Sequence, residues 1–334
     1  MTAILASIVA LVVTLVLLWP LRQLAIRLRI LDDPGPRKVH TNPVPYLGGA
    51  AMIGGVAAGV LWLHPESWAI VVLLVMVSTI GLVDDIRYLP VWVKLVGETS
   101  IAIAAVALGF TWHVSDSAGL NAGFSVLWLV GLTNSFNLLD NMDGLASTVA
   151  AVALIAMIAL VPQPSIFAAP LAAAAVAFLA VNRPPAKMYM GDGGSLMLGF
   201  GVALCSISIA NSAHGLHSAV LLIAPVALAL FDTSLVIVSR LLSGRPVQLG
   251  GKDHFSHRLR MLGMSAYGVL AVTLLAGAVA WAGAALAIRY PLVDAWLALP
   301  IFLGFALAWG GLLRVDPYAV TVKPALEVHH AQGL

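Results

Sequence analysis

Long apolar runs separated by short polar loops constrain the fold of this sequence more than any other feature. A helix that crosses a bilayer needs about 20 mostly apolar residues. Segments that meet this description are 3–20, 47–63, 67–83, 91–111, 124–139, 144–161, 165–181, 194–210, 218–242, 265–288 and 292–313. Only 10% of the residues are charged, against about 25% in soluble domains. We predict an all-α fold, a polytopic membrane helical bundle of about eleven transmembrane helices, or ten if two short neighbouring segments merge.

The basic residues predict how the bundle is oriented. No positive residue precedes the first apolar run, and Arg22, Arg27 and Arg29 follow it, so we interpret the run as a retained helix rather than a signal peptide. With the N-terminus outside, all 17 Lys and Arg residues except Arg289 fall on one side. The positive-inside rule makes that side cytoplasmic. The small net charge of +2 and the scattered basic residues argue against binding of nucleic acid.

Two adjacent carboxylates, Asp84 and Asp85, follow the third apolar run in "STIGLVDDIRYLP". Carboxylates at a membrane boundary usually mark a functional site. A metal ion or an acid–base role towards phosphate would explain the pair, and so would a salt bridge to Arg87 or Lys94. From this motif alone, a structural and a functional role are equally favoured.

The loop "NSFNLLDNMDGLA" spaces Asn134, Asn137, Asp140 and Asp143 by three residues. On a helix, this spacing would spread the four side chains over roughly half the circumference, along one wall of a cleft. Carboxylate and amide oxygens suit Mg²⁺ and the donors of a sugar or a nucleobase. The alternative is an ordinary polar turn.

Two further loops carry acidic or basic candidates. Asp192 lies between glycines in "MGDGGS", where it is exposed to a ligand or caps the next helix. Lys38 and His40, in "RKVHTNPVPYLGG", form a basic cluster that either anchors the loop to lipid head groups or belongs to a site.

The last long loop, "GRPVQLGGKDHFSHRLRMLG", offers His254, His257 and Arg258. Zinc is disfavoured because no cysteine is near, the single Cys205 being placed inside an apolar run where we expect it to pack. Phosphate binding fits better, since a guanidinium matches phosphate oxygens. Asp232 stands alone in an apolar segment; it either lines the cleft or makes a structural pair, and we favour the pair.

Acidic and amide oxygens together with cations are what a Mg²⁺-bound diphosphate requires, and a membrane setting suggests a lipid substrate. The residues alone therefore indicate phosphoryl or phosphosugar transfer at the membrane surface. The rival class is a transporter of an anionic substrate. Transporters usually place ionisable residues near the bilayer midplane and often contain inverted repeats, whereas these acids lie at helix ends on one side, so we favour an enzyme.

At "RKVHTNPVPYLGG", "DD" with Lys94, "NSFNLLDNMDG", "MGDGGS" and "DHFSHRL", the chain resembles the polyprenyl-phosphate N-acetylhexosamine-1-phosphate transferases. The resemblance implies a single transmembrane catalytic domain, 1–334, in the bacterial cytoplasmic membrane with its site facing the cytoplasm. It also implies transfer of a sugar-1-phosphate, most simply N-acetylglucosamine-1-phosphate, from a UDP-sugar to a polyprenyl phosphate with release of UMP, for synthesis of a cell-wall or surface polysaccharide. Mg²⁺ is the expected cofactor, with Mn²⁺ as a substitute, and a homodimer is left open.

The sequence departs from the family pattern in two places. Asn141 replaces the first glycine of an Asp-Gly-x-Asp-Gly motif, and the last motif has only two histidines. These departures favour a branch outside the phospho-N-acetylmuramoyl-pentapeptide transferases of peptidoglycan synthesis, which remain the alternative.

The resulting hypothesis gives each candidate residue a role. The expected catalytic residues are Asp84, Asp85, Asp192 and His257; the expected substrate-binding residues are Lys38, His40, Lys94, Asn134, Asn137, Asp140, Asp143, His254 and Arg258; the expected metal ligands are Asp192 and Asn137. Asp84 or Asp85 would deprotonate or position the lipid phosphate. A covalent route through an aspartate is also chemically open.

Overall fold

A computed structural model describes residues 2–33, 42–161, 166–248, 250–289 and 294–318. Its longer helices are α1 (Thr2–Leu28), α2 (Gly48–Leu63), α3 (Trp68–Ile86), α4 (Val91–Ala107), α5 (Ala118–Leu139), α6 (Leu145–Leu160), α7 (Ala168–Asn182), α8 (Gly191–Ala210), α10 (Ala227–Leu242), α12 (Ala266–Arg289) and α13 (Asp294–Leu313). The shorter elements are β1 (Leu31–Asp32), β2 (Val44–Pro45), α9 (Gly215–Ile223), α11 (Phe255–Met261) and the 3₁₀ turns η1 (Pro65–Ser67) and η2 (Ala224–Val226).

Each of the apolar segments predicted to span a membrane coincides with a helix, and 218–242 runs through α9, η2 and α10. Within the described residues, six helices are long and apolar enough to cross a bilayer, and several shorter apolar helices accompany them. The predicted all-α membrane bundle is therefore confirmed, while the number of crossings stays a prediction. The two-residue strands β1 and β2 pair antiparallel, with Leu31 opposite Pro45.

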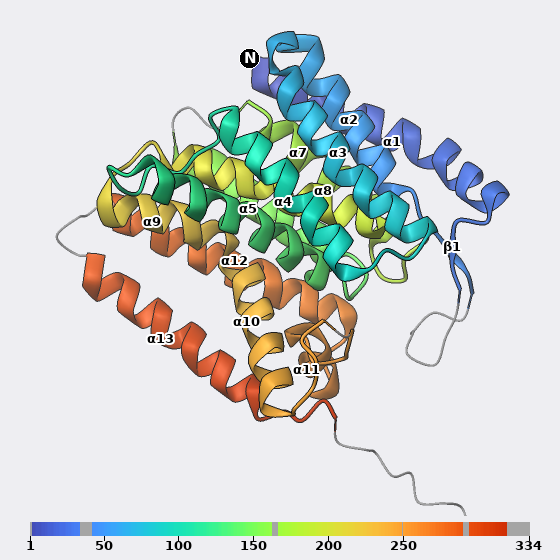
Figure 1. Ribbon diagram of the computed structural model, residues 1–334. Coiled ribbons are helices and arrows are strands. Elements are labelled where there is room, and N and C mark those ends of the chain that lie inside the picture. The colour runs from blue at the N-terminus through green and yellow to red at the C-terminus, as the bar shows by residue number, and fades with distance from the viewer. Residues whose placement is uncertain (1, 34–41, 162–165, 249, 290–293, 319–334) are drawn as a thin grey trace, which may run out of the picture.

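Helix α8 forms the centre of the bundle. Nearly all of its residues are buried, Cys205 among them, as predicted. It packs against α2, α3, α5, α6 and α7, which surround it (Figure 1). Small residues along α2, α7 and α8 suit the close helix packing found in membranes, so the start of α8 is held on several sides.

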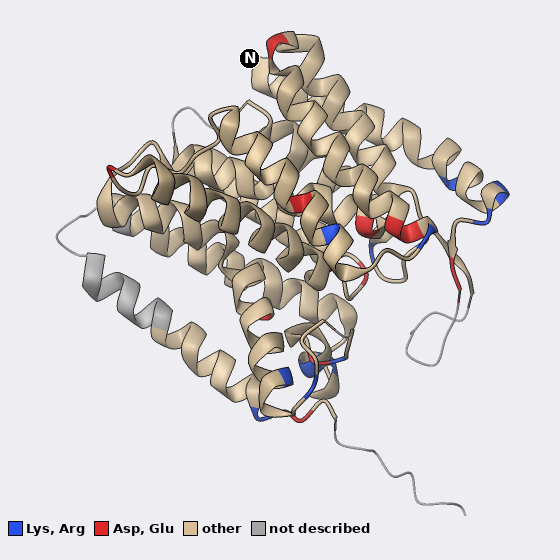
Figure 2. Ribbon diagram, in the orientation of Figure 1, with Lys and Arg blue, Asp and Glu red and all other residues tan. Residues whose placement is uncertain are grey.

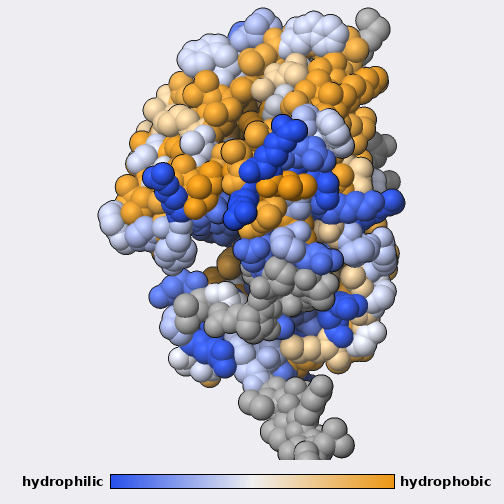
Figure 3. Space-filling view, turned by 90° about the vertical axis from the view of Figure 1, so that its right-hand side faces the viewer, coloured by the Kyte–Doolittle hydropathy of each residue, from blue (hydrophilic) through white to orange (hydrophobic). Residues whose placement is uncertain are grey.

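Charged residues gather at one end of the bundle. Lys, Arg, Asp and Glu lie mainly around the ends of α1 and α3, the start of α4 and the region of α10 and α11, and few lie elsewhere on the ribbon (Figure 2). A view of that side shows hydrophilic residues gathered beneath a broad apolar surface (Figure 3). The fold therefore brings the polar loops together on one face, as the sequence predicted.

Candidate active site

A lysine between two carboxylates forms the centre of the polar face. Lys94, at the start of α4, donates to Asp84 Oδ2 at 2.8 Å and to Asp192 Oδ2 at 2.5 Å. Asp84 lies in the last turn of α3 and also accepts from the Leu89 backbone N–H at 2.6 Å. The Lys94 and Asp84 side chains are only 13% and 14% exposed, whereas that of Asp192 is 32% exposed. The cluster therefore opens towards solvent on the side of Asp192.

Asp85 makes different contacts from Asp84. Its carboxylate accepts from the backbone N–H of Asp192 at 2.9 Å and of Gly193 at 3.2 Å, so it caps the N-terminus of α8 from another helix. A carboxylate there also complements the positive end of the helix dipole. The adjacent pair thus divides: Asp84 contacts Lys94, and Asp85 fixes the backbone that carries Asp192.

Two glycines allow α3 to approach the start of α8. A Cβ on Gly81 would lie 2.3 Å from the Asp192 carbonyl, so any side chain would force the helices apart. Gly191 has φ of +69°, and a Cβ there would lie 2.3 Å from Asp85 Oδ2. Glycine is the residue that tolerates both conditions. The glycines of "MGDGGS" therefore serve the position of Asp192.

The end of α5 supplies the amide wall. Asn137 Nδ2 donates to Ser195 Oγ on α8 at 3.0 Å, which leaves its amide oxygen for another partner. Asn134 Nδ2 instead donates to Glu98 Oε2 at 2.5 Å. Glu98 is 1% exposed, and its Oε1 has no hydrogen-bond partner in the described structure. Glu98 is not among the residues predicted from sequence; its signal is an acid four residues after Lys94 in an apolar run.

Two residues of the loop after α5 accept hydrogen bonds from other segments, one from the α7–α8 loop and one from α11. Asp143 accepts from the Ala186 backbone N–H at 2.9 Å, in the loop before α8. Asn141, which departs from the family pattern, accepts from Ser256 Oγ on α11 at 2.5 Å. Burial, reinforced by neighbouring carboxylates with Asp192 first among them, raises the pKa of Asp140 to about 8. Other carboxylates therefore lie close enough to Asp140 to interact with it, and a cation among them would be favoured.

The histidine–arginine loop is more deeply buried than expected. Asp232 is 0% exposed; it accepts from the Phe255 backbone N–H at 2.8 Å and hydrogen-bonds His254 Nδ1 at 2.7 Å, so the favoured structural pair is confirmed. Arg258 is also 0% exposed. Its guanidinium donates to Ser239 Oγ and to backbone carbonyls, including Leu312 O at 2.8 Å. The expected contacts of Arg258 and His254 with substrate gain no support from this geometry.

His257, in the same segment, remains available for the predicted catalytic role. Its ring lies 6.0 Å from that of His254, centroid to centroid. Burial, together with the charges of His254 and Lys252, lowers the pKa of His257 to about 4. At neutral pH its imidazole is therefore uncharged and offers one donor and one acceptor. Lys38 and His40 lie outside the described residues.

The residues present fit a hard divalent cation that shares its ligands with a substrate. Among the described residues, no group of three or more His, Cys, Asp and Glu side chains could hold a metal ion. Mg²⁺ in phosphate-transfer sites, however, is usually bound by one or two carboxylates together with substrate phosphates and water. The Asp192 carboxylate and the Asn137 amide oxygen are hard donors of this kind, next to the negative charge around Asp140.

The fold and this face define a multi-pass membrane protein with a polar site of carboxylates and lysine at one end of its bundle. A family model described as "Glycosyl transferase family 4" matches residues 67–210. A Bacillus subtilis protein named "Probable undecaprenyl-phosphate N-acetylglucosaminyl 1-phosphate transferase" is 32% identical over 278 residues, covering 78% of both chains. The chain therefore belongs to glycosyl transferase family 4, and the predicted resemblance is confirmed.

Two other relatives carry related names. A decaprenyl-phosphate N-acetylglucosaminephosphotransferase of Mycolicibacterium smegmatis is 30% identical over 311 residues, covering 79% of this chain and 77% of the relative. A phospho-N-acetylmuramoyl-pentapeptide-transferase of Lactobacillus gasseri is 27% identical over 273 residues, covering 72% and 84%. Sugar-phosphate transferases are thus the class to which this chain is similar.

Proposed function

We propose that this protein transfers N-acetylglucosamine-1-phosphate from a UDP-sugar to a polyprenyl phosphate and releases UMP, with its site on the cytoplasmic side of the bacterial cytoplasmic membrane. The observation that carries the proposal is Lys94 between Asp84 and Asp192, which joins a cation for phosphate to a carboxylate for a metal. The relatives' names support the substrates, and the basic residues gathered at one end of the bundle support the orientation.

Each residue of the site has a separate proposed role. Lys94 neutralises phosphate charge as the bond to UMP breaks, and Asp84 holds the acceptor phosphate or removes its proton so that its oxygen attacks the sugar-bound phosphorus. Asp85 positions Asp192 through the α8 backbone. Asp192 and Asn137 would hold Mg²⁺, or Mn²⁺ in its place. Such a cation, when bound, would offset the charge of the diphosphate. Catalysis is then mainly electrostatic and positional.

An apolar groove supports a site for the isoprenoid chain. A cavity of about 300 Å³ is lined by Phe124, Leu127 and Trp128 of α5 and by Leu230 of α10. Leu127 is 69% exposed, so the groove opens towards the surrounding apolar phase. Helix α5 leads from this groove to Asn137 at the site. We assign the groove to the lipid tail of the acceptor, with its phosphate towards Lys94.

The test of the reaction is release of UMP from UDP-N-acetylglucosamine by the purified protein in detergent, with polyprenyl phosphate and Mg²⁺. Turnover should require all three components, and Asp192→Asn should abolish it while the thermal unfolding curve changes little. Other UDP-sugars, including UDP-N-acetylmuramoyl-pentapeptide, test the alternative donor. No UMP release with any donor, from protein that is folded, would refute the proposal.

The groove has its own test. A Cβ on Gly131 meets nothing within 4 Å, so Gly131→Trp is accommodated by the helix and fills the groove that this residue lines. The KM for polyprenyl phosphate should rise severalfold, with the KM for the UDP-sugar unchanged. Gly123→Trp is the matched control, because Gly123 has the same open space on α5 but does not line the groove. Equal effects of both variants would overturn the assignment.

A further inference from the structure

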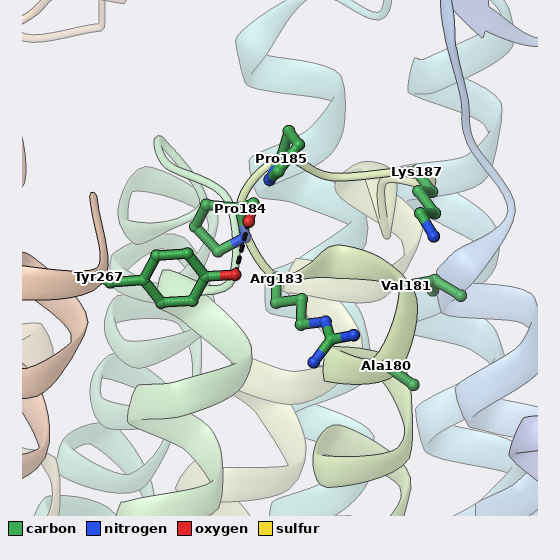
Figure 4. Close-up of a pocket in the computed structure, with 7 residues that line it drawn as sticks. All are labelled: Ala180, Val181, Arg183, Pro184, Pro185, Lys187 and Tyr267. Atoms are coloured by element: carbon green, nitrogen blue, oxygen red, sulfur yellow. Dashed lines mark hydrogen bonds between the residues drawn. The ribbon is translucent and has the colours of Figure 1, made fainter. Parts of the chain in front are cut away.

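A second pocket lies outside the candidate active site, between the α7–α8 loop and α12. Its volume is about 430 Å³. Ala180 and Val181 of α7 form an apolar floor, and Arg183 and Lys187 of the loop extend over it (Figure 4). Tyr267, at the start of α12, closes one side and donates its hydroxyl to the Pro184 carbonyl at 2.6 Å. The pocket therefore combines an apolar surface with cations at the end of a membrane helix.

Two basic side chains line this pocket. Within the described residues, neither Arg183 nor Lys187 makes an ion pair, and both side chains are exposed. A third cation is close, because Arg22 Nε of α1 donates to the Lys187 carbonyl at 3.3 Å. Two cations of the α7–α8 loop and one of α1 thus lie in the same region, and none of the three makes an ion pair within the described residues.

The position of the pocket indicates which kind of ligand would bind there. Lys187 lies in the loop that leads into α8, and Asp192 lies in the first turn of that helix, so the pocket lies on the face of the candidate active site. Cations at the cytoplasmic membrane surface attract anionic head groups, each contributing about fivefold in affinity. The apolar floor on the last turn of α7 suits the start of an acyl chain better than a free anion. The acceptor lipid already has its own groove, on α5 and α10.

We propose that this pocket binds the phosphate of an anionic bilayer phospholipid, with Arg183, Lys187 and Arg22 around the head group and the glycerol end of an acyl chain over Ala180 and Val181. The choice of leaflet rests on the orientation proposed above, and the distinction from the acceptor lipid rests on the groove assigned to it there. The bound lipid links α1, the α7–α8 loop and α12. It therefore stabilises the loop that leads to Asp192 against thermal unfolding.

The test measures binding without turnover. Full-length protein in detergent is titrated with phosphatidylglycerol or with phosphatidylcholine, and bound lipid is counted by native mass spectrometry. Phosphatidylglycerol should bind in preference and raise the unfolding temperature. Arg183→Gln and Lys187→Gln should each weaken this binding about fivefold. Ala180→Trp should weaken it too, because the indole fills the pocket while every charge remains.

The control is Arg27→Gln, which removes an exposed cation of α1 that does not line the pocket. It should leave the affinity for phosphatidylglycerol unchanged. An equal loss in Arg27→Gln, or full binding in Ala180→Trp, would show diffuse attraction and overturn the proposal. Displacement of phosphatidylglycerol by polyprenyl phosphate at equal concentration would also overturn it, since the pocket would then take the acceptor. Because UMP release is measured separately, failure here leaves the proposed reaction standing.

Discussion

Asp85→Asn separates a positioning role from direct participation in the chemistry. The Asp85 carboxylate accepts two backbone N–H groups, at 2.9 and 3.2 Å, whereas an amide offers a single oxygen. Hydrogen bonds to a charged group contribute about 1.5–3 kcal/mol, and neutral ones about 1 kcal/mol. One charged bond becomes neutral, and the other N–H then faces the amide NH₂. The first change costs about 0.5–2 kcal/mol and the second about 1.5–3 kcal/mol, so we expect the free energy of unfolding to fall by about 2–5 kcal/mol.

The same change should displace the residue that Asp85 holds. Because Asp192 is proposed to bind Mg²⁺, the half-saturating Mg²⁺ concentration of Asp85→Asn should rise together with the fall in kcat. Asp84→Asn is the control: it should lower kcat with little change in the Mg²⁺ requirement. The assays are UMP release against Mg²⁺ concentration and thermal unfolding in detergent. A large loss of kcat in Asp85→Asn with unchanged Mg²⁺ requirement and unchanged stability would refute the positioning role.

Three further predictions concern other groups. The pKa of His257 is lowered to about 4 in the folded protein and is about 6.5 in an unfolded chain, so the unfolded state binds the proton more readily between these values. The free energy of unfolding should therefore fall as pH drops from about 6.5 to about 4. His257→Gln should remove that part of the pH dependence, measured by thermal unfolding. Lys94→Gln should lower kcat strongly, and Lys94→Arg should restore part of it in the UMP assay; full activity in Lys94→Gln would contradict its role. A double-mutant cycle of Glu98→Leu and Asn134→Leu should give a coupling of about 1 kcal/mol in unfolding, and simple additivity would contradict their contact.

The sequence predicted the fold and the grouping of the loops well, because both depend on patterns that the chain displays directly. Apolar length defines helices, and charge asymmetry defines a common face. What it could not provide is the pairing of individual side chains. Asp84 and Asp85 are identical neighbours in sequence, and their roles separate only because successive helical residues point in different directions, one to α4 and the other to α8. Glu98 was missed because its partner lies on α5.

The arginines show why residue type alone overstates a phosphate site. Arg240 binds Asp253 through two contacts, at 2.7 and 3.0 Å, and Arg258 donates to the Asp253 carbonyl at 2.8 Å. These buried guanidinium groups join α10, the loop before α11 and the end of α13. Breaking a buried ion pair such as Arg240–Asp253 costs about 3–5 kcal/mol, and leaving buried groups without their hydrogen-bond partners is also costly. Loss of activity in an Arg258 variant would therefore report misfolding as readily as lost phosphate binding. Lys94 differs because it contacts the partly open Asp192, where a substrate phosphate can compete for the same cation. A cation whose partner is partly exposed is available for chemistry, whereas a cation whose partners are buried serves the fold. The exposure of the partner distinguishes the two better than the charge itself.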